Sequence, residues 1–261
     1  MRLIDTHCHL NFKAFDADFL SVAQNSKKHG VKKVIIVGSD KKTSTRALEV
    51  AKKINGFFAE KWAFVAVGIH PIHFDKLPEF EQVSRLAEDE LVVAIGETGF
   101  DFYRVDQGIS FKKQRELFYR HIKLTKNIGK PLIFHNRAAD GIFGQELKDL
   151  KGARGVFHCF SSDHHFAHRV IELGFMISFT GNITYGNKKL KKVVKQVPLE
   201  KIMVETDAPY IVPEPQRSEG IARNEPYLVS EVIKKIAKEK ELSFAKVAQQ
   251  TTENAMGFFS L

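Results

Sequence analysis

The segment KKVIIVGS, residues 32–39, decides the fold class of this chain. Four β-branched apolar residues, Val34 to Val37, stand in a row and are followed by Gly-Ser. A near-continuous apolar run of this kind is typical of a parallel strand that is covered on both of its faces. The segment therefore predicts a buried strand in a parallel sheet.

The same pattern recurs along the whole chain, as a short apolar run, a turn and then an amphipathic helix. We expect strands within 2–10, 32–39, 63–71, 91–99, 130–137, 154–161, 175–182 and 201–209. We expect helices over 17–29, 42–54, 79–89, 110–129, 140–150, 163–173, 187–197 and 226–240, with one or two more over 242–259. Eight such units without a linker predict an α/β fold, a single-domain (β/α)8 TIM barrel over residues 1–261. A doubly wound sheet is the alternative, although open sheets usually stop near six strands.

The composition indicates a soluble globular protein, with 43% hydrophobic and 27% charged residues among 261. No apolar run approaches the roughly 20 residues that span a bilayer, so we expect no membrane contact. MRLID leads directly into a strand, which leaves no room for a signal peptide and favours a cytoplasmic location. Two cysteines, Cys8 and Cys159, make no disulfide framework, and we expect reduced thiols.

The charge balance favours polyanionic partners without identifying one. Forty basic residues against thirty-one acidic residues give a net charge of +9. The clearest basic cluster lies within 187–197, where lysines recur at helical spacing opposite leucine and valine. We interpret these lysines, Lys188, Lys191, Lys192 and Lys195, as the solvated face of a packed helix.

Polar residues with metal-binding side chains follow the predicted strands. In IDTHCHL, residues 4–10, the alternation of an extended chain puts His7 and His9 on the same face. The carboxyl ends of barrel strands open at one mouth, so we expect every polar residue at the end of a predicted strand to lie there. Four histidines and two carboxylates would be costly to desolvate together, and a divalent metal offsets that cost. The residues at the strand ends are His7, His9, His70, Glu97, His135, Arg137, His158, Glu205 and Asp207.

The chain resembles the TatD family of metal-dependent deoxyribonucleases, within the amidohydrolase-like barrels. The motifs that carry the resemblance are DTHCHL, VGIHP, GETGFDF, FHNRAAD, HCFSS, ETDAPY, RNEP and TTENA, in the order of the family. The resemblance implies two metal ions at the mouth of the barrel. His7, His9 and Asp207 would bind the first ion, His135 and His158 the second, and Glu97 would bridge both. The chain departs from the family pattern within GFDF and at the end of HCFSS, at positions that are not implied ligands, and the role of His73 stays open.

The resemblance also implies a reaction, the hydrolysis of DNA as a 3′–5′ exonuclease acting on single strands or 3′ ends. Two close ions suit phosphodiester hydrolysis, and Asp207 could orient or deprotonate the attacking water. Glu205 is a second base or an orienting group, or else a packed barrel residue. His70 and Arg137 could bind the scissile phosphate. Tyr103 and Arg104 could stack on bases and contact phosphates.

Two other functions remain open on the sequence. The same two-metal barrel could hydrolyse small amides or esters, such as D-aminoacyl esters, although the basic charge balance favours nucleic acid. A binding module without turnover would lack some of the ligands, and none is missing. The donor types do not choose between zinc, magnesium and manganese, and the sequence leaves the oligomeric state open.

Overall fold

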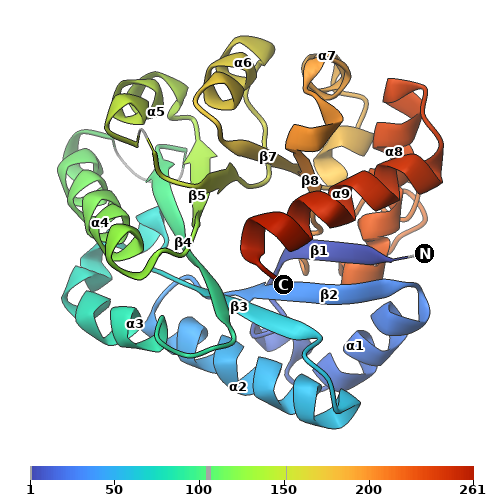
Figure 1. Cartoon of the computed structure of the whole chain (residues 1–261), viewed down its shortest axis with the longest axis horizontal. Helices are drawn as coiled ribbons and strands as arrows, with labels where there is room; N and C mark the ends of the chain where they lie inside the picture. Colours follow the sequence, from blue (N-terminus) through green and yellow to red (C-terminus); the bar gives the residue numbers. More distant parts are fainter. Residues whose placement is uncertain (1, 104–106, 151) are drawn as a thin grey trace.

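A computed structural model describes residues 2–103, 107–150 and 152–261, and it has one parallel sheet of eight strands (Figure 1). Each strand pairs in parallel with the next, in the order β1 to β8. The sheet curves until β8 meets β1, where Asp207 N–H donates to the His7 carbonyl at 2.9 Å and His9 N–H to the Ala208 carbonyl at 2.7 Å. The predicted (β/α)8 barrel is confirmed. The strands are β1 Leu3–Cys8, β2 Val31–Val37, β3 Ala63–Val67, β4 Val92–Asp101, β5 Leu132–Arg137, β6 Gly155–Phe157, β7 Met176–Phe179 and β8 Ile202–Val204.

Helices surround this sheet, close to the predicted segments (Figure 1). The segment expected as a helix over 79–89 begins inside a 3₁₀ segment, Pro71–Glu79, and its α-helical part is short. The segment expected over 140–150 ends its α-helix early and continues as a 3₁₀ turn, Leu147–Leu150. The helices are α1 Phe19–Lys28, α2 Lys41–Phe58, α3 Phe80–Leu86, α4 Gln107–Ile128, α5 Asp140–Glu146, α6 His164–Glu172, α7 Lys188–Gln196, α8 Val229–Lys240 and α9 Phe244–Phe259.

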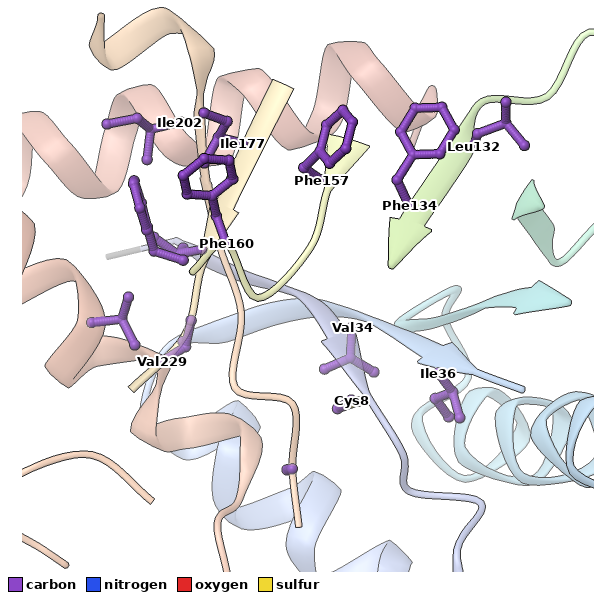
Figure 2. Packing of buried hydrophobic residues seen from close by; sticks show 14 of the residues in the cluster. Cys8, Val34, Ile36, Leu132, Phe134, Phe157, Phe160, Ile177, Ile202 and Val229 are labelled. Carbon is purple, nitrogen blue, oxygen red and sulfur yellow. The ribbon is translucent and has the colours of Figure 1, made fainter. Parts of the chain in front are cut away.

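The segment that predicted the fold is buried on both faces. All four residues from Val34 to Val37 are fully buried. Val34 and Ile36 face the layer between sheet and helices, and Ile35 and Val37 belong to a separate cluster with side chains from the other strands. Figure 2 shows the first cluster, in which Phe134 and Phe157 of neighbouring strands lie side by side at a ring distance of 4.9 Å.

Helix α9 covers the amino end of the barrel and leaves the carboxyl end open. The Thr252 hydroxyl donates to the Arg2 carbonyl at 2.8 Å, at the start of β1. The Asn254 side chain donates to the Ile202 carbonyl at 2.7 Å, at the start of β8. Functional side chains at the carboxyl ends of the strands therefore face an open mouth.

Two smaller predictions are also confirmed. Cys8 and Cys159 are free thiols. The four predicted surface lysines of α7, Lys188, Lys191, Lys192 and Lys195, are exposed, and Leu190 and Val193 on its opposite face are buried. Among the described residues, none of the helices combines the length and apolar character that a membrane span requires.

Candidate metal centre

The six side chains proposed as metal ligands from the sequence meet at the carboxyl end of the barrel. They come from β1, β4 and β5 and from the residues that directly follow β1, β6 and β8. Five of them line a cavity of about 570 Å³, and His7 lies buried directly behind it. The six are His7, His9, Glu97, His135, His158 and Asp207.

The first group of donor atoms surrounds a point between β1, β4 and β8. The Nε2 atoms of His7 and His9 are 3.3 Å apart. Glu97 Oε1 lies 3.4 and 3.6 Å from these two nitrogens, and Asp207 Oδ1 lies 3.7 and 3.3 Å from them. An ion with four tetrahedral ligands at about 2.0–2.2 Å sets them about 3.3–3.6 Å apart. The observed spacings fit such an ion.

The second group shares Glu97 with the first. Its other oxygen, Oε2, lies 3.3 Å from His135 Nδ1 and 3.0 Å from His158 Nε2. The two nitrogens are 3.1 Å apart. Glu97 thus offers one oxygen to each group, which is the arrangement expected of a carboxylate that bridges two ions.

Hydrogen bonds behind two of the histidines, His9 and His135, show that their lone pairs point into the cavity. His9 Nδ1 is 2.9 Å from the Val37 carbonyl, and His135 Nε2 is 3.1 Å from Asp101 Oδ2. Carbonyl and carboxylate oxygens only accept, so these nitrogens carry the protons of the neutral rings. The opposite nitrogens, His9 Nε2 and His135 Nδ1, then present lone pairs to the cavity. Lone pairs packed this closely beside a carboxylate need a cation between them, so the residues fit divalent ions.

His70 lies among the same atoms, with Nε2 3.6 Å from Glu97 Oε2, but its hydrogen bonding differs. Its Nδ1 accepts the Ile72 N–H at 3.1 Å. A neutral His70 therefore carries its proton on Nε2 and has no lone pair there for an ion. The role of His70 as a substrate contact stays a prediction, in which Nε2–H would donate to a phosphate oxygen.

The pKa shifts of Glu97 and His70 indicate the charge of each side chain. Burial raises the pKa of Glu97, but His158 and His7 outweigh it and hold the pKa well below its usual range. Burial, together with His135, lowers the pKa of His70 well below its usual range. Glu97 is therefore a carboxylate, and His70 is a neutral ring.

Glu205 lies behind the centre and does not line the cavity. Its side chain is buried, and its Oε1 accepts the Cys159 N–H at 2.6 Å. The same oxygen is 3.5 Å from His158 Nδ1, and His158 Nε2 on the other side of the ring faces Glu97. In an extended strand, side chains two residues apart lie on the same face, which would place Glu205 beside Asp207. This alternation does not apply here, because β8 ends at Val204. The position fits an orienting group and does not reach an attacking water.

Three buried polar residues were missed in the sequence, and they hold the centre in place. Asp101 accepts from His135, as described above. Asp5 accepts both the N–H and the hydroxyl of Thr206, at 2.9 and 2.6 Å, and so ties β1 to the segment that carries Asp207. Asn224 donates to the Thr206 carbonyl at 2.9 Å. Asp5 lies in the motif DTHCHL, Asp101 in GETGFDF and Asn224 in RNEP. Their place inside these motifs was the sequence signal that could have identified them as supporting residues.

Two of the expected substrate contacts, Arg137 and Tyr103, lie together beside the cavity. Arg137 lines the cavity, and its guanidinium lies over the Tyr103 ring at 4.2 Å. Tyr103 is 69% exposed, and Arg137 makes no ion pair with any residue that the structure describes. Arg104 lies outside the described residues.

Asp101→Asn is expected to weaken metal binding by about 10-fold, because the amide no longer selects the tautomer that leaves His135 Nδ1 free. Metal titration of the metal-free variant, followed by calorimetry, measures this loss. Excess metal should restore most of the occupancy. An affinity equal to that of the wild type would show that Asp101 does not orient His135.

A (β/α)8 barrel with two groups of imidazole and carboxylate donors at its open end defines the class of this protein, a metal-dependent hydrolase. The sequence profile of the family described as TatD related DNase matches residues 4–260. The chain belongs to the TatD family.

Individual relatives cover nearly the whole chain. A Bacillus subtilis (strain 168) protein, named as the uncharacterized metal-dependent hydrolase YabD, is 36% identical over 99% of both chains. A Homo sapiens protein named Deoxyribonuclease TATDN3 is 30% identical over 98% of this chain and 94% of its own length. The crystal structure of YJJV, a TatD homolog from Escherichia coli K12, is 27% identical, with a TM-score of 0.86 over 100% of this chain and 98% of that one.

Proposed function

We propose that this protein is a two-metal 3′–5′ exonuclease that shortens single-stranded DNA. The observation that carries the proposal is the pair of donor groups sharing Glu97, with Arg137 on the wall of the same cavity. The name of the human relative, a deoxyribonuclease, supports DNA as the substrate. The 3′–5′ polarity follows the resemblance to the family.

Two divalent ions held by these residues would lower the pKa of a water molecule and neutralise charge on the attacking and leaving oxygens. His7, His9 and Asp207 would hold one ion and His135 and His158 the other, with Glu97 between them. Asp207 lines the cavity, so its Oδ2 can take the proton of the attacking water. Arg137 can hold the phosphate by two parallel hydrogen bonds, and His70 can donate Nε2–H to a phosphate oxygen.

The test offers two substrates to the purified protein, a 5′-labelled single-stranded DNA and a D-aminoacyl ester. We expect a ladder of DNA products shortened from the 3′ end, its loss with chelator and its return with zinc, magnesium or manganese. The ester should remain intact. A Glu97→Gln preparation, purified in the same way, controls for a contaminating nuclease. Ester hydrolysis without DNA cleavage would replace this proposal by an acyl-ester hydrolase.

A further inference from the structure

A second cavity, of about 1160 Å³, adjoins the cavity of the metal centre. The two cavities share four lining residues, Phe12, Ser39, His73 and Tyr210. The second one extends between the residues after β1 and the first turns of α2, and we call it the α2 groove. An extended ligand bound at the metal centre can continue into this groove without leaving the protein surface.

The α2 groove carries lysines that are free to meet a ligand. Lys13, Lys41 and Lys42 line it, are exposed and make no ion pair with any described residue. Lys41 and Lys42 begin α2, whose first turn has no acidic residue, so the positive end of the helix dipole adds to their charge.

The acidic residues of the groove are largely neutralised by other partners. Asp40 caps α2 through Thr43 N–H and pairs with Lys76. Arg46 lies 3.5 Å from Asp16 and 3.2 Å from Glu49. Arg46 is thus shared between two carboxylates, and Glu79 makes no ion pair with a described residue. The lining thus carries four basic and four acidic residues, but Lys13, Lys41 and Lys42 stay exposed and unpaired among the described residues, which suits contacts with a chain of phosphates.

Two aromatic side chains, Phe12 and Tyr210, line both cavities where they join. Phe12 stacks on His9 with ring centroids 4.3 Å apart, and Tyr210 meets Phe12 edge-on at 6.4 Å. Tyr210 is 54% exposed. An exposed ring beside unpaired lysines is a combination that binds unpaired nucleotides, because any base can stack on the ring.

We infer that the α2 groove binds the nucleotides of single-stranded DNA beyond the scissile phosphate, with Tyr210 stacking on a base and Lys13, Lys41 and Lys42 contacting successive phosphates. That the bound ligand is single-stranded DNA rests on the proposed function. Binding is measured separately from cleavage, so the two can fail independently.

The first experiment measures fluorescence anisotropy of a labelled oligo-dT of 12 nucleotides with the metal-loaded protein. Phosphorothioate linkages at its 3′ end slow cleavage. The triple variant Lys13→Gln, Lys41→Gln, Lys42→Gln is expected to bind on the order of 10- to 100-fold more weakly. Its salt dependence should be shallower by about 2 in log–log slope, from three lost phosphate contacts at about 0.7 each.

A matched control removes the same charge elsewhere. Lys28, Lys32 and Lys53 are exposed, make no ion pair with a described residue and lie away from the open mouth. Their triple Gln variant should bind within about threefold of the wild type, because contacts beyond a Debye length are screened. An equal loss in both triple variants would overturn the groove, because net charge alone would explain it. Failure of the wild type to bind the oligonucleotide would overturn it as well.

The second experiment compares kcat/KM for the 12-mer without phosphorothioates and for a dinucleotide, which is too short to enter the groove. The groove variant should lose at least about 10-fold more on the 12-mer than on the dinucleotide. Equal losses on both substrates would contradict the inference. Groove-dependent binding without any DNA cleavage would keep the inference and refute the proposed exonuclease.

Discussion

Glu97→Gln is expected to remove most of the bound metal and to lower DNA turnover by about 10³-fold or more, the largest effect of any single change in this chain. Among the residues that the structure describes, Glu97 alone contributes an oxygen to each donor group. The neutral amide keeps the shape but removes a negative charge from both ions at once. Elemental analysis of purified protein, together with single-stranded DNA hydrolysis, measures the two losses.

His9→Ala is the matched comparison, because His9 belongs to the first group alone. It should lower the metal content by about one ion per chain and leave the second group filled. Circular dichroism of both variants checks that the barrel is folded. Metal content in Glu97→Gln equal to that of the wild type would refute the bridging role.

Arg137→Ala is expected to lower DNA turnover by about 100-fold while the bound metal stays unchanged. The guanidinium lines the cavity, is held over Tyr103 and pairs with no carboxylate among the described residues. Its loss removes a bidentate phosphate contact, so activity should also fall less steeply with added salt. Turnover at several salt concentrations, with elemental analysis, tests both statements.

Arg137→Lys separates charge from geometry. The lysine keeps the positive charge but cannot form two parallel hydrogen bonds or stack in the same way on Tyr103. We expect a turnover between those of the wild type and the alanine variant. Any hydrolysis of an uncharged ester should survive in both variants. A fall in ester activity instead of DNA activity would indicate an acyl-ester hydrolase.

The fold could be predicted because its signals are local. A short apolar run, repeated eight times with amphipathic helices between the runs, leaves few ways to bury every strand. The same rhythm predicts that residues after the strands share one mouth, and the six proposed ligands do lie there. That they bind metal ions stays a prediction for each residue.

The exact ends of the strands and helices were harder to predict from the sequence. Glu97 was expected at the end of a strand, but β4 continues through Asp101, past a register shift between Ile95 and Thr98. The pairing partner β5 determines how far β4 extends. A short window of sequence does not contain that information.

The roles of side chains within the centre depended on residues far away in the chain. Asp101 meets His135 and Glu205 meets His158, 34 and 47 positions apart. His70 is a donor because of the Ile72 N–H, which is set by the local turn and not by residue type. The α2 groove likewise exists only because the residues after β1 lie beside the start of α2.

The sequence by itself determined the strands, the helices and the chemical types gathered at the mouth, because side-chain periodicity and apolar patterning act over a few residues. Only the tertiary structure decided which nitrogen of each histidine faces the cavity, which carboxylate is shared and which lysines remain unpaired. Those properties depend on hydrogen bonds and ion pairs between strands and loops that packing alone brings within about 3 Å of one another.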